Sequence, residues 1–375
     1  MAVIEEGARS RSWRNRAISL LIQVGLFVVI FGWLLPKFID FEAVWEAIKG
    51  LTWWEFLVLL LIAIGRIPTE AMIYRALLPG LHLRVGTECY LSQNFAGTVL
   101  PPPASSIVQY AYFRTDGFEE RQSLIGAVGS FIFPSAGRMA MPLVAVAFLT
   151  ATGYGNPEAF WIAIASLVVL LIAAVVIWLV GRSDNSARWV GDQSGRLISA
   201  VLAVFRRKPV TGVGDMLVNF RTHTYAIVRQ RWLAGSIAVT INLFVTYVLL
   251  VVSLRFVGLS NDDISASQIF SALAIGFFAG AVLPVTSSGL GTVDAIIISA
   301  LSAMSGNSDL SAAGEFVWRI FYSILAVPIG VFTLNRFRKT NGPLLTEALH
   351  AAAGLREEMA SEAGGESSAP APTAL

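Results

Sequence analysis

The feature that most constrains this chain is a series of long apolar runs that contain almost no charge. Six of these runs are long enough, as helices, to cross a hydrocarbon core about 30 Å thick. They cover residues 17–35, 53–74, 122–152, 158–180, 232–257 and 311–334. Only 14% of the 375 residues are charged, against roughly 25% in a soluble domain. The sequence therefore predicts an all-α integral membrane protein with six full spans.

Two further apolar stretches, 86–113 and 267–304, are broken in the middle and share a repeated phrase. Residues 95–101 read FAGTVLP and residues 278–284 read FAGAVLP, so six of the seven letters agree. Near-identity over such a phrase indicates that the chain contains two related halves. With the six full spans, these two stretches bring the number of hydrophobic segments to eight.

Prolines break both stretches at the end of the repeated phrase. Pro101, Pro102 and Pro103 have no N–H, so a helix must stop where they begin, and Pro284 holds the matching place in the second stretch. The arms of the first break would be about 21 and 15 Å long as helices, too short to span. We therefore expect re-entrant helical hairpins. The arms of the second break, of 17 residues each, leave two full crossings as an alternative.

The basic residues indicate how the chain is oriented. Most of the 27 Lys and Arg residues lie at the termini, after the second span, after the first hairpin and in the 182–231 loop. By the positive-inside rule these segments and both termini are cytoplasmic. The first hairpin then enters from the cytoplasm and the second from outside, so the halves are inverted copies. Inverted repeats with broken helices are typical of carriers.

The sequence also predicts the segments outside the spans. Residues 1–16 form a basic cytoplasmic N-terminus, and the transmembrane domain covers residues 17–338. In the 182–231 loop, apolar residues recur at helical spacing among arginines, which favours two amphipathic helices on the inner leaflet over a solvated linker. Residues 339–375 lack apolar periodicity, which is typical of a disordered tail.

The second break carries the most specific motif, LPVTSSGLGTVD at residues 283–294. It is similar to the pattern L-P-x-x-P-G-G-L-G-x-x-E of the lysylphosphatidylglycerol synthase family, a broad group of bacterial and archaeal membrane proteins. The matching positions are Leu283, Pro284, Ser287, Ser288, Gly289, Leu290, Gly291 and Asp294. The chain resembles the transmembrane, flippase-like region of that family over about residues 17–338, including Arg319 and Gly330 in the last span.

The first hairpin departs from the family pattern. Where relatives tend to have L-P-G-R-x-G-D and a further arginine, this chain has LPPPASS at residues 100–106 and then Gln109. The charged groups of that turn are missing, so the headgroup specificity is expected to differ there. The aminoacyl-transferring domain of fused relatives is also absent from this sequence, so the resemblance does not imply lysine transfer.

The resemblance implies a flippase that moves an anionic phospholipid or a lipid-linked envelope intermediate across a bacterial or archaeal plasma membrane. Two alternatives stay open: a non-catalytic partner of an envelope-lipid enzyme, and a secondary carrier of a small amphipathic anion. Membrane lipids are the expected partners, with no nucleic acid. The chain has no HExxH, CxxC or GxxxxGK[ST] motif, so we expect no enzymatic activity, metal or cofactor. The sequence leaves the lipid, the energy source and the oligomeric state open.

Two intramembrane arginines are the leading candidates for binding. Arg138 lies 37 residues after Pro101, and Arg319 lies 35 residues after Pro284. A guanidinium at membrane depth either binds a lipid phosphate or forms a structural ion pair; for Arg319 the pairing partners would be Glu315 or Asp294. The same two carboxylates are the candidates to carry a proton if transport is coupled.

Three further predictions concern smaller features. Ser105, Ser106, Ser287 and Ser288 begin the return helices, where they would cap the helix or help to bind an anionic headgroup. Gly289 and Gly291 are expected to permit a tight turn. Arg66 and Glu70, four residues apart on one helix, are expected to satisfy each other.

Overall fold

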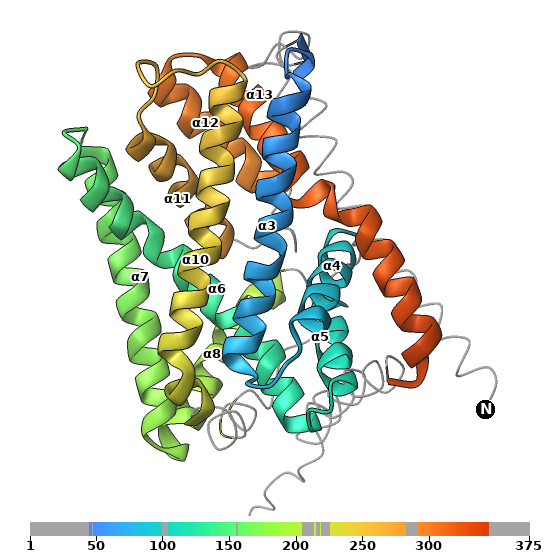
Figure 1. The fold of residues 1–375 in the computed structure, drawn as a ribbon. Helices are drawn as coiled ribbons and strands as arrows, with labels where there is room; N and C mark the ends of the chain where they lie inside the picture. Colours follow the sequence, from blue (N-terminus) through green and yellow to red (C-terminus); the bar gives the residue numbers. More distant parts are fainter. Residues whose placement is uncertain are drawn as a thin grey trace, which may run out of the picture.

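The computed structural model describes a helical molecule (Figure 1). The described residues are 45, 46, 48–99, 104–154, 157–204, 214, 218, 226–282 and 291–344, and none of them is in a β-strand. The helices are α3 (Trp53–Leu77), α4 (Leu83–Val99), α5 (Ala104–Thr115), α6 (Glu120–Ala151), α7 (Pro157–Arg182), α8 (Asp184–Val204), α10 (Ala226–Phe256), α11 (Ala266–Val282), α12 (Thr292–Ser305) and α13 (Ser308–Arg319), followed by the π-helical segment η4 (Ile320–Ile324). The predicted first span, 17–35, lies outside the described residues.

Among the described residues, four helices are long and apolar enough to cross a membrane. They are Trp53–Leu77, Glu120–Ala151, Gln230–Phe256 and Ser308–Leu344. Each coincides with a predicted span, and α7 covers the predicted span 158–180 as one helix of 26 residues. The last helix continues to Leu344, past the predicted start of the tail at residue 339. It is held there by Phe337, which is buried and stacks on Tyr112 of α5 with 4.0 Å between ring centroids.

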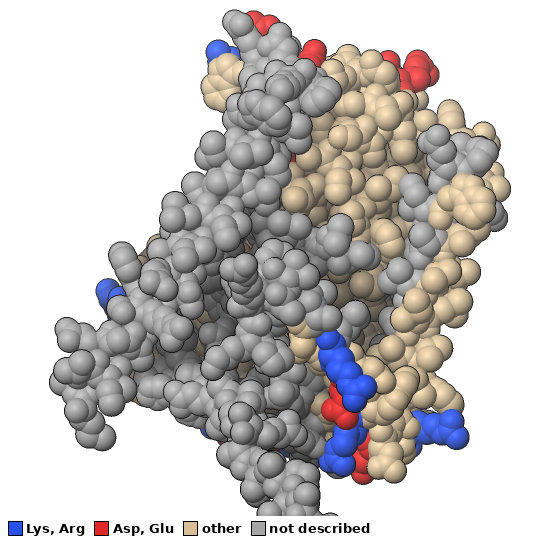
Figure 2. All heavy atoms as spheres, turned by 180° about the vertical axis from the view of Figure 1, so that it is seen from behind, with Lys and Arg blue, Asp and Glu red and all other residues tan. Residues whose placement is uncertain are grey.

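The outer surface suits a bilayer. Large apolar side chains such as Leu61, Phe131, Leu171, Phe244 and Phe332 are exposed, and Figure 2 shows a broad uncharged area between red atoms at the top and blue and red atoms at the bottom. Exposed tryptophans lie near helix ends, where membrane proteins place them at the lipid–water interface; examples are Trp53, Trp54, Trp178 and Trp232.

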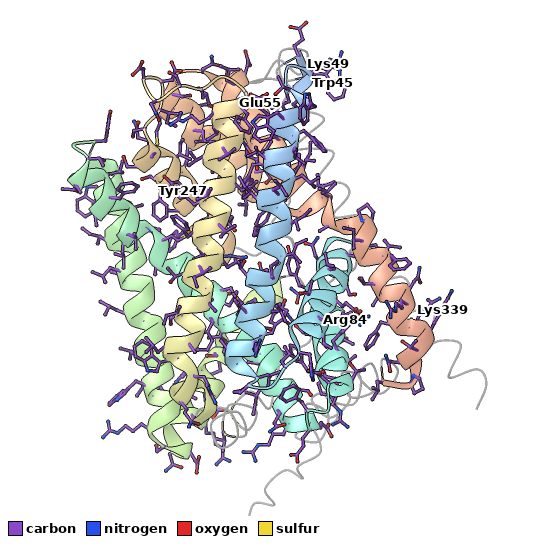
Figure 3. All side chains as sticks on the ribbon, in the orientation of Figure 1. Trp45, Lys49, Glu55, Arg84, Tyr247 and Lys339 are labelled. Carbon is purple, nitrogen blue, oxygen red and sulfur yellow. The ribbon has the colours of Figure 1, made fainter. Side chains whose placement is uncertain are left out.

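The centre of the molecule is an antiparallel pair, α3 and α10. α3 begins at a capping box in which the Thr52 N–H donates to Glu55 (2.7 Å) and the Glu55 N–H donates to Thr52 (3.4 Å). Glu55, near the start of α3, and Tyr247, near the end of α10, both lie in the upper half of Figure 3. Between the helices, the Asn242 amide donates to the Thr69 hydroxyl at 2.8 Å, so these two buried polar groups are paired.

Two pairs of short helices flank this centre at opposite ends. α4 and α5 pack against each other in the lower half of Figure 1, whereas α11 and α12 pack against each other in the upper half. The first helix of each pair also contacts a long helix from the other half of the chain. α11 packs on α6. α4 packs on the segment 326–344, where a Cβ on Gly330 would lie 2.3 Å from the Leu91 carbonyl oxygen.

The predicted amphipathic segment begins with a real helix, α8. Its buried Ala187 and Val190 pack against Val180 of α7, while Trp189 is exposed. α10 begins at Ala226, inside the predicted loop, and the predicted second amphipathic helix falls largely on residues outside the described part of the chain. The single cysteine, Cys89, is a buried free thiol, as expected of a small apolar residue.

Candidate functional site

Arg319 lies at the end of α13 and pairs with two carboxylates. Its Nη2 atom contacts Oδ1 of Asp294, and its Nε atom lies 3.7 Å from Oε1 of Glu315. All three residues are buried. Both ion pairs that the sequence offered for Arg319 therefore form, and one guanidinium is shared between them.

Asp294 is held in place by the start of α12. Its other carboxylate oxygen accepts the backbone N–H of Gly291 at 2.8 Å, and it lies in the first turn of the helix, where the partial positive charge favours an anion. Gly291 has φ 88°, a conformation in which a side chain would be strained. The predicted need for glycine at this turn is confirmed at residue 291.

Glu315 is less well satisfied than Asp294. It is fully buried at 0% exposure, and within the described part of the chain neither of its carboxylate oxygens has a hydrogen-bond partner. Its ion-pair partner, Arg319, is also held by Asp294. Burying a carboxylate in this way is costly, which marks Glu315 as a candidate functional group.

Arg138 of α6 joins the same region from the other half of the chain. Its guanidinium carbon lies 5.2 Å from the centre of the Phe277 ring of α11, and it is close enough to Arg319 for the two positive charges to repel. Arg138 is half-buried, and it makes no ion pair with any carboxylate that the structure describes. Of the two predicted binding arginines, it is the one left without a compensating anion.

The three arginines lie beside a cluster of aromatic rings. We define it as Phe277, Trp318 and Tyr322; Trp318 stacks on Tyr322 at 4.6 Å between ring centroids, and Phe277 lies 6.2 Å from Trp318. The Arg319 guanidinium lies 4.8 Å from the Trp318 ring, and a third arginine, Arg66 of α3, lies 4.4 Å from the Tyr322 ring. Ring faces attract cations, so the cluster lets positive charges lie close together in an apolar interior.

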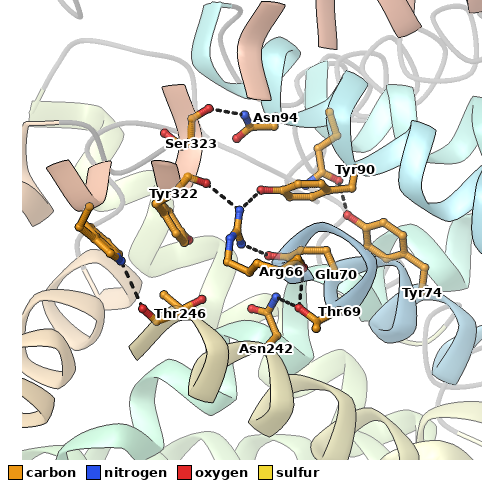
Figure 4. A network of polar contacts seen from close by, with 12 residues as sticks. Arg66, Thr69, Glu70, Tyr74, Tyr90, Asn94, Asn242, Thr246, Tyr322 and Ser323 are labelled. Carbon is orange, nitrogen blue, oxygen red and sulfur yellow. Dashed lines mark hydrogen bonds and ion pairs between the residues drawn. The ribbon is translucent and has the colours of Figure 1, made fainter. Parts of the chain in front are cut away.

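Arg66 does more than form the predicted ion pair (Figure 4). Its Nη1 atom donates to Glu70 at 3.3 Å, which confirms that pair, and its Nη2 atom also donates to the Tyr90 hydroxyl and to the Tyr322 carbonyl at 2.7 Å. Arg66 is only 1% exposed. It therefore ties α3 to α4 and to the last helix, a role that pairing with Glu70 alone does not predict.

The carbonyl groups bonded here belong to an irregular part of the last helix. Directly after Arg319 the chain forms the π-helical segment η4, and Pro328 has no N–H to offer the Ile324 carbonyl. Side chains from the first half bond this segment: Arg66 reaches the Tyr322 carbonyl, and the Asn94 amide donates to the Ser323 carbonyl at 3.0 Å. Single π-helical turns are common at functional sites. Pro328 was the sequence signal for this irregularity.

The repeated phrases begin beside this region. Asn94 directly precedes FAGTVLP and Phe277 directly precedes FAGAVLP. Asn94 bonds the Ser323 carbonyl, and Phe277 contacts the rings of Trp318 and Tyr322. Asn94 and Phe277, which hold matching positions before the two phrases, therefore contact the same short stretch of the last helix. The sequence of neither phrase predicts this contact by itself.

The other predicted site residues are placed less centrally. α5 begins at Ala104, so Ser105 and Ser106 lie within its first turn, and their predicted role in capping or headgroup binding stays a prediction. Gln109 is buried and bonded to neighbouring polar side chains. Pro101, Pro102, Pro103, Pro284, Ser287, Ser288 and Gly289 lie outside the described residues.

Comparison with known proteins identifies the family. No protein of curated function matches the chain. The family model described as the lysylphosphatidylglycerol synthase TM region matches residues 20–330, a stretch that includes Arg66, Arg138, Asp294 and Arg319. That match covers a membrane region rather than a catalytic domain, and it points to a function related to membrane lipids. The chain belongs to the lysylphosphatidylglycerol synthase TM region family.

Proposed function

We propose that this protein is a flippase that moves an anionic phospholipid or lipid-linked envelope intermediate between membrane leaflets. One observation carries the proposal: arginines from α3, α6 and α13 meet at one aromatic cluster inside the helix bundle. Intramembrane charges are expensive and mark pathways more often than they stabilise a fold. The family match, which concerns a lipid-related membrane region, supports the same reading.

The binding group in this proposal is Arg138. Arg66 is occupied by Glu70, Tyr90 and the Tyr322 carbonyl, and Arg319 is occupied by two carboxylates. Arg138 has no ion pair with a carboxylate among the described residues and is half-buried. Its planar guanidinium suits bidentate binding of a phosphate, with Arg319 nearby to add positive charge.

The architecture in this proposal is an inverted repeat with two re-entrant hairpins. α4–α5 would enter from the cytoplasm and α11–α12 from the opposite face, with both termini cytoplasmic. The short helices, their place at opposite ends of Figure 1 and their reciprocal packing on α6 and the last helix support it. Basic residues near the lower end, including Arg84 and Lys339 (Figure 3), support the orientation.

Transport would follow from movement of one half against the other, with the acyl chains remaining in the bilayer. The hairpin turns would line the route of the headgroup. In this proposal Ser105, Ser106, Ser287, Ser288 and Gly289 would contact the anion beside the helix starts, whereas the Gly291 N–H is donated to Asp294. The contacts of Arg66 and Asn94 with the last helix join the two halves, and they would have to change during the cycle.

A transfer assay in liposomes tests this function. The purified protein is reconstituted with fluorescent phosphatidylglycerol, and leaflet transfer is followed by a membrane-impermeant quencher. Replacing Arg138→Gln should slow transfer at least about tenfold, since a charge-assisted hydrogen bond contributes roughly 1.5–3 kcal/mol.

The matched control is Arg84→Gln, because Arg84 is an exposed arginine whose ion pair with Glu88 lies far along α4 from the cluster. It should transfer lipid at the wild-type rate. Equal transfer by wild type and Arg138→Gln would remove Arg138 from the mechanism, and protein-independent transfer in every sample would refute the flippase function.

A further inference from the structure

Four charged residues lie together in this region, and we call them the charge cluster: Arg138, Arg319, Asp294 and Glu315. Arg138 and Arg319 contribute two positive charges, and Asp294 and Glu315 contribute two negative charges when both are ionised. Arg66 and Glu70 form a separate neutral pair. With both carboxylates ionised, the cluster carries no net charge, which is the arrangement that costs least in a low-dielectric interior.

A lipid phosphate disturbs this balance. A monoanion bound by Arg138 adds one negative charge and leaves the cluster with a net charge of −1. An uncompensated charge inside the bundle is costly, and the simplest compensation is one proton taken up by a carboxylate. Entry of the anion and uptake of the proton are then linked events.

Glu315 is the carboxylate better suited to accept that proton. Asp294 is held in its charged form by Arg319, by the Gly291 N–H and by the start of α12. Glu315 has only the 3.7 Å contact with Arg319, and it lies mid-helix in α13 with both oxygens lacking hydrogen bonds to described residues. Of the two carboxylates, Glu315 therefore has the less compensated negative charge.

The surroundings contain no other competing charge within the described residues. Glu315 faces Arg319 on its own helix, Asp294 on α12 and, beyond Arg319, Arg138 on α6. The elements packed nearby, α10 between residues 232 and 254 and the whole of α11, carry no charged side chain. Across the Tyr322 ring, α3 adds only the paired Arg66 and Glu70.

Polar side chains lead from the surface toward Glu315. At the exposed turn between α12 and α13, the Ser305 hydroxyl lies 2.9 Å from the hydroxyl of Ser311. Ser311 is fully buried and lies one helical turn before Glu315, on the same side of α13. Hydroxyl groups both donate and accept, but neither serine bonds to Glu315 in this structure, so the two hydroxyls mark only the side from which a proton would approach.

We infer that the protein moves one proton together with each anionic lipid, and that Glu315 carries the proton. This inference rests on the proposed flippase function. The carboxylate takes up a proton from the aqueous side as the phosphate enters, and it releases the proton as the phosphate leaves. The transported pair is neutral, so the proton gradient drives the lipid in the direction of proton flow and the membrane potential adds nothing.

The test uses liposomes that contain the full chain, a trace of fluorescent phosphatidylglycerol and an internal pH dye. With the outside more acidic by one pH unit, one-to-one coupling should enrich the labelled lipid in the inner leaflet by up to about tenfold. The dye should report proton entry that depends on the lipid. Glu315→Gln, which imitates the protonated side chain, should still transfer lipid but without enrichment and without proton entry.

Asp262→Asn is the matched control, because Asp262 is an exposed carboxylate in the loop before α11, outside the cluster. It should behave as wild type. If wild type transfers lipid equally with and without the gradient and no protons enter, the coupling is refuted while the flippase function stands. Enrichment that survives Glu315→Gln would remove Glu315 as the carrier. Absence of any protein-dependent transfer would refute both. The wild-type dye measurement decides the coupling even if Glu315→Gln does not fold.

Discussion

The two pairs of short helices share a sequence phrase but are held together by different chemistry. In α4–α5 the contact between the helices is polar. The side-chain amide of Gln109 donates to the side-chain oxygen of Gln93. The Tyr74 hydroxyl of α3 donates to the same oxygen at 3.0 Å, and the Ser130 hydroxyl of α6 donates to the side-chain oxygen of Gln109 at 3.0 Å. Side-chain hydrogen bonds of this kind join helices inside membranes, where no water competes.

In α11–α12 the contact is made by close packing. Gly276 and Gly280 form a G-x-x-x-G motif, and they face Ile297 and Val293 of α12. A Cβ would lie 2.3 Å from Ile297 at the first glycine and 2.6 Å from Val293 at the second. The absence of side chains on these glycines lets the two helices approach closely.

This difference shows where each pair keeps its polar groups. The first pair distributes neutral amides and hydroxyls along its length, whereas the second is apolar along its length and brings one carboxylate, Asp294, to the arginine cluster. The two pairs of short helices therefore differ in the polar groups that they contribute. The second pair brings a charged group to the arginines, and the first contributes uncharged polar side chains that bond to one another and to α3 and α6.

The largest expected effect on stability comes from removing the arginine that Asp294 and Glu315 share. Arg319→Leu leaves Asp294 and Glu315 buried without their shared cation, which should lower the free energy of unfolding by about 3–5 kcal/mol. Thermal unfolding in detergent micelles measures the change. Combining Arg319→Leu with Asp294→Asn and Glu315→Gln should recover much of the loss. A single variant as stable as wild type would show that the cluster has another source of positive charge.

Enlarging a glycine tests the close packing of the second pair. Gly276→Val should destabilise the protein by about 1–3 kcal/mol, because the added atoms overlap Ile297 and force α11 and α12 apart. Gly65→Val, at a helical glycine of α3 with no atom within 4 Å, is the control. Size-exclusion profiles and thermal unfolding should separate the two variants, and equal behaviour would contradict the tight contact.

The polar contact of the first pair is tested by removing one or both amides. Gln109→Leu removes one buried hydrogen-bond partner from Gln93 and one from Ser130, and it should cost about 1–3 kcal/mol. The double variant Gln93→Leu/Gln109→Leu removes both amides and should be less destabilised than the single variant. If the double variant loses the sum of both single effects, the amides do not act as a unit.

The smallest effect comes from the matching glycines of the two phrases. A Cβ at Gly97 would lie 3.8 Å from Ser105, an ordinary contact, so Gly97→Ala should stabilise α4 by up to about 1 kcal/mol. Gly280→Ala overlaps Val293 and should destabilise by a similar amount. The melting temperature should therefore rise in Gly97→Ala and fall in Gly280→Ala. A change in the same direction in both variants would contradict the difference in packing between the two pairs of helices.

Much of the fold follows from the sequence because lipid imposes simple rules. Long uncharged runs in lipid must be helices, so the spans within α3, α6 and α10 were predictable. The end of α4 at Val99 was predictable as well, because three consecutive prolines without N–H groups follow at residues 101–103. The ion pair of Arg66 with Glu70 was also predictable, since both lie on one helix four residues apart.

The site was only partly predictable, because it depends on packing between distant helices. Arg138 and Arg319 were recognised as unusual, but nothing in the sequence near Arg138 indicates that it would lie over Phe277. The π-helical segment and its bonds to Arg66 and Asn94 require the last helix to be placed beside α3 and α4. Such contacts are set by tertiary structure, so periodicity and motif spacing do not predict them.

The most direct test of the central claim is to find where a lipid headgroup sits. Phosphatidylglycerol with a photoactivatable group on its headgroup is reconstituted with the protein, irradiated, and the crosslinked peptides are identified by mass spectrometry. Binding at the arginine cluster predicts crosslinks in the segments that carry Arg138, Phe277 and Tyr322, and their loss in Arg138→Gln. Crosslinks confined to lipid-facing side chains such as Leu171 and Phe332, and unchanged in Arg138→Gln, would contradict it.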